Sequence, residues 1–466
     1  MDTVFESIEE LIAKYWFWIL VIIGVYFIFV FGLQYDVIGW VLRFIGVIVL
    51  GRVAWILWVH YIRQDFISGI DFVLLEIIPP REVERSPKAM ELFFTNALYH
   101  WSMKGGKEEF WQGAVWFWFS LEIASIDGQV HFYIRTPTRL RELIETQMYA
   151  QYPQAQVKAV EDYTLAVDEV SPASDWNAWG CEFKLLKPEA YPIKTYVDFG
   201  LDKDPKEEYK VDPISPVIEL FGSLKKGEQM WLQIVITPSK KEYKEHGSRF
   251  KTHDWVEEAR RELFRLLKDF TALKGKGDIT HGVASMADLG KDSRVEIRVP
   301  DYLKRAVDRM NAKVSKIGFD TGVRVMYIAK KEMYNMSNRR NLRLIFRQYT
   351  APDINGLNRH NSTQGDAYSG IFTASTETVM LLANRMLNEF RERSFFHLPL
   401  RHHLFNKHNV PWPFDGMIKA YFHPETFVLN TEELATLWHF PGQILKVPTL
   451  ERIESKESSP PPNLPT

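Results

Sequence analysis

The sequence predicts an α+β protein that opens with a two-helix transmembrane hairpin and continues as tandem ferredoxin-like α/β sandwich modules. Residues 15–61 are almost wholly apolar, and the later chain alternates period-two strand patterns with amphipathic helices. The end of the chain is rich in proline. We expect six segments: an amphipathic interfacial helix (1–14), the hairpin (15–62), a first cytoplasmic α+β module (63–200), a second (201–350), a helical or irregular docking region (351–450) and a proline-rich tail or linker (451–466).

The hairpin consists of two apolar runs. Tyr15–Leu33 carries no charge and is about as long as the roughly 20 residues that cross a bilayer. Val37–Tyr61 is equally long but contains Arg43 and Arg52. These arginines project from roughly opposite faces of one helix, so we expect them to snorkel to the headgroups or to pair with another helix. A functional buried charge is the alternative.

Charge around the spans predicts their orientation. Lys14 precedes the first span, residues 34–36 contain no lysine or arginine, and Arg63, Arg81 and Arg85 follow the second. Acidic residues before the first run argue against a cleaved signal peptide. We therefore expect a cytoplasmic (inner) membrane protein with both termini and most of the chain on the cytoplasmic side. The single cysteine, Cys181, fits that reducing side.

The first module is expected from a strand at 72–78, a hairpin over 114–136 and a helix over 138–151 followed by a short strand. Asp127-Gly128 between two apolar runs is typical of a two-residue hairpin turn. A strand pair, a crossover helix and another strand make half of a ferredoxin-like sandwich.

The second module begins with Val211–Pro238, which reads as a short helix, a turn and an alternating strand. Amphipathic helices are expected over 255–273 and from Pro300 to Ile317, with a returning strand at 322–329. A helix with a basic face follows around 338–348, and another helix occupies 376–393.

The sequence shows little sign of catalysis. No phosphate-binding loop is present, because no Gly-x-x-x-x-Gly-Lys-Ser/Thr pattern occurs. Four histidines between 397 and 408 lack the repeated spacing of a structural metal site. Cys181 lies in an apolar run and reads as a small buried residue. We expect no enzyme activity, no cofactor and no metal.

One basic stretch of the sequence is a candidate site for binding nucleic acid. The net charge of −2 excludes a globally basic coat protein, but the stretch 330–347 is locally basic and could follow phosphates along one helical face. The alternative is a solvated face paired with acids or anionic lipid. The residues expected to bind nucleic acid are Arg339, Arg340, Arg343 and Arg347.

Three segments together resemble the membrane-proximal half of type IV secretion coupling-type ATPases of the HerA/TraG-like kind: Val211–Ile236, Phe427–Gly442 and the closing residues 448–466. In that family a membrane hairpin and tandem α+β domains precede a RecA-like motor. The resemblance implies that Phe427–Gly442 lies against the motor. The partner-binding candidates are Thr431, Glu432, Glu433, His439, Phe440 and Gly442, with local capping and packing as the alternative.

The sequence stops where the motor of such proteins would start. Either the motor is a separate chain that docks here, or this half works as a scaffold, or the chain is a truncated product; we expect a motor in trans. The resulting hypothesis is a non-catalytic, membrane-anchored subunit that docks a RecA-like translocation ATPase of a type IV secretion or conjugation-like DNA or protein transfer system. It would be a hexamer if it follows the motor. The alternative is a membrane tether that binds nucleic acid through the basic helix.

Overall fold

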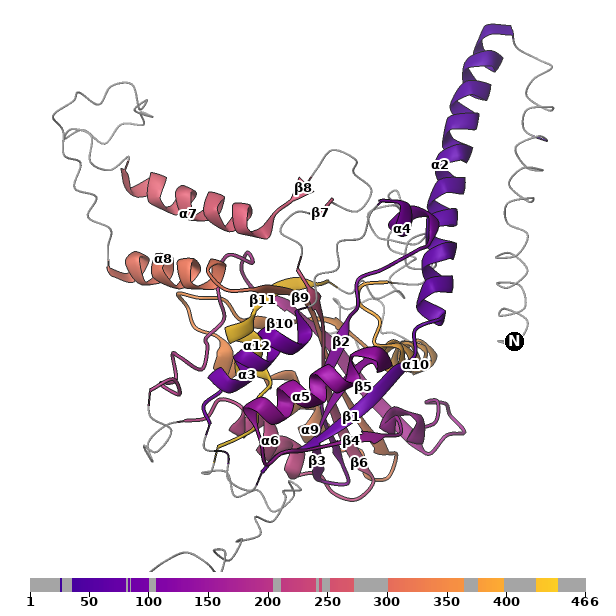
Figure 1. Ribbon diagram of the computed structural model, residues 1–466. Helices are drawn as coiled ribbons and strands as arrows, with labels where there is room; N and C mark the ends of the chain where they lie inside the picture. The colour runs from indigo at the N-terminus through magenta and orange to yellow at the C-terminus, as the bar shows by residue number, and fades with distance from the viewer. Residues whose placement is uncertain are drawn as a thin grey trace, which may run out of the picture. The chain divides into compact units, whose positions relative to one another are not determined.

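The computed structural model describes residues 26, 36–80, 83, 85–99, 106–203, 211–239, 243–244, 252–271, 301–363, 376–397 and 425–442. The chain divides into two compact units. One unit comprises residues 1–71 and 101–116, and the other comprises residues 72–100 and 117–466. Figure 1 labels their helices and strands.

The smaller unit contains one long apolar helix, α2 (Asp36–Ser68), and a short helix, α4 (Gly106–Trp111). Within α2, the 25 residues from Phe44 to Ser68 are long and apolar enough to cross a membrane, and only 6% of an 18-residue apolar window within them is buried. The second expected span is therefore a helix, but it continues to Ser68 rather than ending at Tyr61. The helix expected over 1–14 and the first span lie outside the described residues, except Tyr26.

The larger unit is built on one nine-stranded sheet, whose first half has the order β4-β1-β3-β2. All neighbouring strands in this half are antiparallel. In chain order the strands are the fourth, first, third and second, with a helical segment after the first and another after the third. Its elements are β1 (Phe72–Ile78), α3 (Lys88–Phe93), the π-helical turn η1 (Phe94–Leu98), β2 (Phe119–Ile126), β3 (Gln129–Pro137), α5 (Arg141–Gln151) and β4 (Gln156–Val160).

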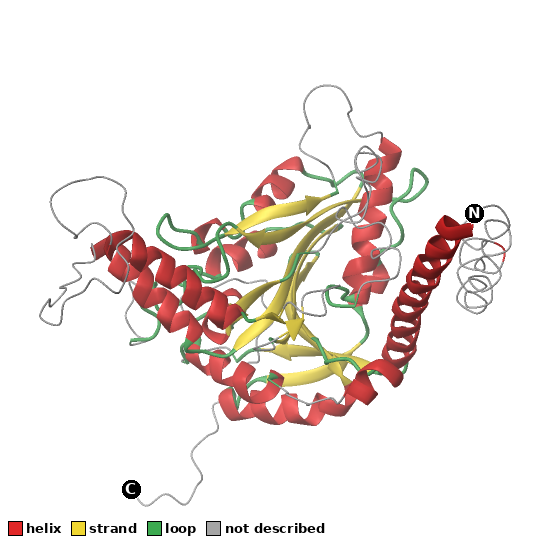
Figure 2. Ribbon diagram, turned by 90° about the horizontal axis from the view of Figure 1, so that it is seen from above, coloured by secondary structure: helices red, strands yellow, loops and turns green. Residues whose placement is uncertain are grey.

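The second half repeats this arrangement in the order β10-β5-β9-β6, again fully antiparallel. Its elements are β5 (Trp176–Leu185), α6 (Ser215–Gly222), β6 (Glu228–Pro238), β9 (Gly318–Lys330), α9 (Met336–Arg343) and β10 (Leu357–Ser362). An insertion between β6 and β9 carries β7 (Tyr243–Lys244), β8 (Thr252–His253), α7 (Trp255–Thr271) and α8 (Asp301–Val314). The helices α7 and α8 run side by side at one end of the sheet (Figures 1 and 2).

The two halves join through their second strands, β2 and β6, which pair antiparallel from Phe119↔Ile236 to Ile126↔Gln229. Every residue of β6 is buried, and so is every residue of β2 except Ile126. Both faces of these central strands are covered, so even their polar residues, such as Ser120, Glu122 and Gln233, are buried.

Helices lie on both sides of the sheet (Figure 2). One face packs against α3, α5, α6, α9 and α12 (Thr431–Leu437), and the opposite face packs against α10 (Thr376–Glu392). Strand β11 (Phe427–Asn430) pairs with β9 and leads directly into α12. Beyond α12, Trp438 contacts Phe94 and Phe132 of the first half, with ring centroids 6.2 and 5.7 Å away, and donates to the carbonyl oxygen of Glu122 at 3.2 Å.

One local prediction is confirmed and two are corrected. Asp127 and Gly128 both have positive φ, 54° and 87°, as the expected hairpin turn requires. Strand β5 lies in the range expected for the first module, but it pairs with β9 and β10 of the second half. The basic helix ends at Arg343, because Leu344 leaves helical geometry and Arg347 begins a separate 3₁₀ turn, Arg347–Tyr349.

Candidate functional site

The residues expected to bind a partner ATPase are held by their own chain, mainly at the start of α12. Asn430 and Glu433 form a capping box, in which each side chain accepts from the backbone N–H of the other residue. The Glu433 carboxylate also lies 3.1 Å from the ammonium of Lys313 on α8, and both side chains are fully buried. Glu433 therefore fixes α12 to α8 rather than facing outward.

Thr431 and Glu432 extend this contact region. The ammonium of Lys316 lies 2.7 Å from a carboxylate oxygen of Glu432 and 2.7 Å from one of Glu91 on α3. The Thr431 hydroxyl lies 3.4 Å from Glu91. Burial alone would lower the pKa of Lys316, but its bonds to the two carboxylates raise that pKa above its ordinary value. These side chains tie α3, α8 and α12 together.

The other three candidates lie after α12. The His439 imidazole is 3.0 Å from the Asp212 carboxylate, and the Gly442 N–H donates to the same carboxylate at 3.1 Å. Burial alone would raise the pKa of Asp212, but His439 and nearby N–H groups lower it. Phe440 packs edge-on against Tyr152. These residues therefore make local capping and packing contacts, which the sequence offered as the alternative to partner binding.

The four arginines expected to bind nucleic acid do not share one helical face. Arg339 and Arg343 lie near Arg359 of β10, and Arg340 and Arg347 are exposed. Burial lowers the pKa of Arg359, and the positive charges of Arg343 and Arg339 lower it further. The Arg339 guanidinium also lies 5.4 Å from the centre of the Trp179 ring. The structure brings three arginines together, one of which was not anticipated.

Two clusters of buried charge lie beneath α10, and neither was expected from the sequence. In the first-half cluster, Glu122 of β2 accepts from Arg393 Nε at 2.9 Å, from Tyr163 at 2.8 Å and from Gln233 at 3.1 Å. Asp162 also pairs with Arg393. Burial would lower the pKa of Arg393, but Glu122 and Asp162 raise it above its ordinary value. Arg393 is therefore a permanent cation within this cluster.

The second-half cluster centres on Arg324 of β9. Its Nη2 donates to Glu182 of β5 at 3.0 Å and lies 3.7 Å from Glu389 of α10. Arg385 donates to Glu389 at 3.2 Å. Burial raises the pKa of Glu389 to about 7, and Glu182 adds to that rise, whereas Arg324 and Arg385 oppose it. One carboxyl in this cluster therefore gains or loses its proton near neutral pH.

Glu122 and Arg324 belong to one polar row that crosses the sheet, because Glu122 is opposite Gln233, Gln233 is opposite Arg324, and Arg324 is opposite Glu182. The available signal was a charged residue between two apolar ones: Glu122 stands between Leu121 and Ile123, and Arg324 stands between Val323 and Val325. Such a residue is almost never fully buried unless it is paired. The sequence does not reveal the partner, which comes from a distant strand or from α10.

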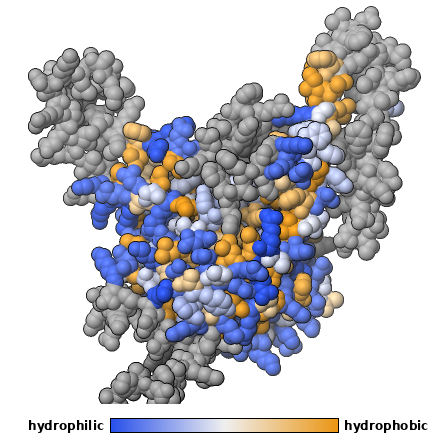
Figure 3. Space-filling view, viewed as in Figure 1, coloured by the Kyte–Doolittle hydropathy of each residue, from blue (hydrophilic) through white to orange (hydrophobic). Residues whose placement is uncertain are grey.

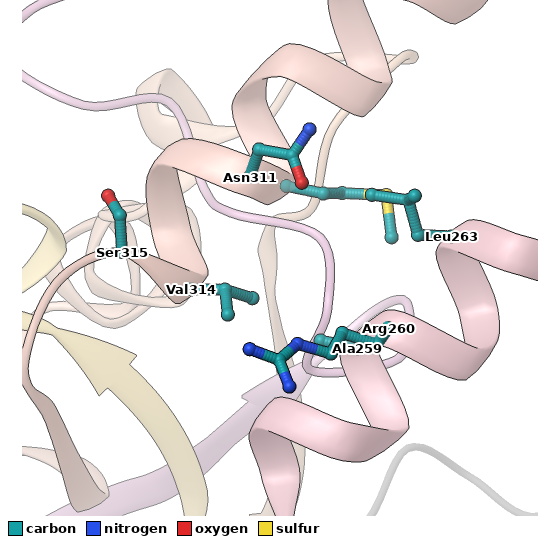
Figure 4. Close-up of a pocket in the computed structure, with 7 residues that line it drawn as sticks. Ala259, Arg260, Leu263, Asn311, Val314 and Ser315 are labelled. Carbon is teal, nitrogen blue, oxygen red and sulfur yellow. The ribbon is translucent and has the colours of Figure 1, made fainter.

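The insertion between β6 and β9 carries an open pocket of about 270 Å³ (Figure 4). It is smaller than the roughly 300 Å³ at which small-molecule sites begin. Its single charged residue is Arg260, and exposed Phe264 lies on the same helix. The pocket has too few polar groups for catalysis. Its lining residues are Ala259, Arg260, Leu263, Met310, Asn311, Val314 and Ser315.

Among the residues that the structure describes, no three histidine, cysteine or acidic side chains lie close enough to hold a metal ion. Cys181 is fully buried, and burial raises the pKa of its thiol. The arrangement thus favours stable packing over thiol chemistry.

Comparison with known proteins matches the central part of the chain to one family and leaves strands β1 and β11 outside the match. The model of one family, described as Domain of unknown function (DUF8128), matches residues 118–386. This range runs from the start of β2 into α10 and includes the junction of the two halves. No curated protein matches the chain. Because the family model covers more than half of its residues, the chain belongs to the DUF8128 family.

Proposed function

We propose that this chain is a membrane-anchored, non-catalytic subunit that docks a RecA-like translocation ATPase. The observation that carries the anchoring is α2, whose apolar stretch Phe44–Ser68 is almost uncovered by protein. A soluble protein rarely leaves so large an apolar surface in water. A bilayer and its headgroup layer would cover most of this stretch, with the first apolar run, Tyr15–Leu33, as the other helix of a hairpin and both termini on the cytoplasmic side.

The sheet supports the likeness to the membrane-proximal half of type IV secretion coupling-type ATPases. Each half has the strand order four-one-three-two with two crossover helices, the order of a ferredoxin-like sandwich. We take the two halves as the tandem modules of that architecture. Their cargo, in this proposal, is DNA or protein moved by the docked motor.

The surface we assign to docking is the α7–α8 pair rather than α12, since the α12 candidates contact their own chain. Phe264 on α7 is 69% exposed, and residues of α7 and α8 line a pocket on the same pair of helices. Exposed aromatic side chains are enriched at the centres of protein interfaces. The ATPase is therefore expected to cover Phe264.

Site-specific crosslinking in the native host tests this assignment. Benzoylphenylalanine replaces Phe264, and the matched control carries it at Leu165, which is 71% exposed on a 3₁₀ turn. Irradiation of intact cells should join position 264, but not position 165, to an ATPase that contains a phosphate-binding loop. Adducts from position 264 that contain no such ATPase would reject the docking proposal.

A second function, nucleic-acid binding, is favoured by the gathering of Arg339, Arg343 and Arg359. Exposed Arg340 and Arg347 would add phosphate contacts. Replacing both by glutamate should weaken DNA binding and reduce the slope of log affinity against log salt by about 1 to 2. Lys225→Glu with Lys226→Glu makes the same charge change on another exposed turn. Equal DNA affinity and equal salt dependence of the two double variants would exclude a specific role for the arginines.

A further inference from the structure

Five aromatic side chains gather where α4 meets α2, and we call them the aromatic collar: Trp55, Trp58, Tyr61, Phe110 and Trp111. The Trp111 ring lies 6.5 Å from Trp55 and 6.3 Å from Trp58, measured between centroids. Phe110 lies 5.9 Å from Trp55, and Tyr61 lies 6.5 Å from Trp58. All five are exposed, and Trp111 most of all at 63%.

The collar is held in place by two contacts on the same pair of segments. Arg63 of α2 donates to the Glu109 carboxylate of α4 at 3.3 Å. Gly113, just after α4, has φ +66°, and a Cβ there would lie 2.0 Å from the carbonyl oxygen of Ile62. Only glycine permits this approach. The chain after α4 is thus pinned against α2.

The position of the collar along α2 matches the layers of a bilayer. From Asp36 to Trp55 the helix rises about 29 Å at 1.5 Å per residue, close to the roughly 30 Å of a hydrocarbon core. From Trp55 to Tyr61 it rises about 9 Å, enough to pass through one headgroup layer of roughly 5–7.5 Å. Arg63 and Asp65 follow. Much of the exposed surface of α2 is apolar (orange in Figure 3).

We propose that the aromatic collar lies in the headgroup layer of a phospholipid bilayer, so that α4 is an interfacial element beside the span. Tryptophan and tyrosine concentrate at that level because each has an apolar ring and a polar N–H or O–H. The proposal rests on the membrane anchoring proposed above. It adds that residues 106–112, which the sequence does not place in any span, contact lipid.

The test uses the full chain in vesicles of phosphatidylcholine and phosphatidylglycerol at a ratio of 7:3. Single cysteines carry a spin label at Ile48 (α2), Gln112 (after α4) or Glu142 (exposed on α5). The native Cys181 can remain, since it is fully buried. Collision rates of each label with oxygen and with a water-soluble nickel chelate report its depth.

We expect the ratio of oxygen to nickel collisions to be highest at position 48, lowest at 142 and intermediate at 112. A value at 112 equal to that at 142 would overturn the collar proposal and leave the anchor intact, and so would a value equal to that at 48. If position 48 matches 142, the membrane anchoring itself fails. Labelling Lys107, on the exposed side of α4, provides a second position that should also be intermediate.

Discussion

The two halves of the sheet share a strand order but bury different charge beneath α10. The first-half cluster sets Glu122 and Asp162 against Arg393, a cation whose pKa the carboxylates raise. The second-half cluster includes Glu389, whose pKa burial raises to about 7. The same topology thus accommodates one cluster around a cation whose pKa is raised and one that contains a carboxyl whose pKa is raised. Backbone pairing does not determine ionisation, which depends on the local partners.

The largest expected effect is that of removing Arg393. Arg393→Met leaves Glu122 and Asp162 without their cation in a buried site, which should cost about 3–5 kcal/mol of unfolding free energy. Urea unfolding of the detergent-solubilised chain measures this loss. Arg340→Met, at an exposed position, should stay within about 0.5 kcal/mol of the parent. Equal losses for both variants would show that the first-half cluster does not depend on its charge balance.

Arg324→Met should cost less, about 1–3 kcal/mol, because Glu389 can take up a proton and Arg385 remains beside it. Since Arg324 lowers the pKa of Glu389, its loss raises that pKa further. The cost should therefore grow as pH rises from 6 to 8. Unfolding the variant and its parent at several pH values measures this growth. A cost that does not change with pH would show that Arg324 does not control the proton on Glu389.

Glu389→Gln should remove a pH dependence of stability. The folded pKa of about 7 lies above the ordinary value of 4.5, so the folded state holds this proton more tightly than the unfolded state. The stabilisation that comes from the proton on Glu389 is complete below pH 4.5. It is lost as pH rises toward 7, by at most about 1.4 kcal/mol per pH unit. Unfolding free energies across this window should fall for the parent and change less for the glutamine variant.

The smallest effect concerns one hydrogen bond in the first-half cluster. Tyr163→Phe removes the hydroxyl that donates to Glu122 at 2.8 Å, and Arg393 still contacts the same oxygen. We expect a loss of about 1–2 kcal/mol, independent of pH between 5 and 8. Measured with Arg393→Met in a double-mutant cycle, the two changes should be non-additive, because both act on Glu122. Additive losses would place Tyr163 outside the cluster.

Much of the local structure could be predicted from the sequence. The Asp127-Gly128 turn, the strand Glu228–Pro238 and the helix Thr376–Glu392 follow from turn chemistry and hydrophobic period. The pairing of β2 with β6 and the placement of β5 in the second half could not, because register between distant strands leaves no local period.

The candidate site was harder to foresee. Glu122 and Arg324 are visible as charges within apolar strands, but their partners Arg393 and Glu182 are identified only by the folded sheet. Conversely, Glu433 and His439 look accessible in a polar helical segment, yet they are buried against Lys313 and Asp212. Polarity alone does not separate a surface residue from a paired interior residue.

The position of Trp438 has a consequence for the order of folding during synthesis. Its ring fills the core beside Phe94 and Phe132, and its indole bonds to Glu122, 316 residues earlier in the chain. The first half is therefore made long before the side chain that completes its core leaves the ribosome. Because contacts between such distant residues form slowly, the nascent protein would expose an unfinished hydrophobic surface while α2, a helix long and apolar enough to cross a membrane, has already been made.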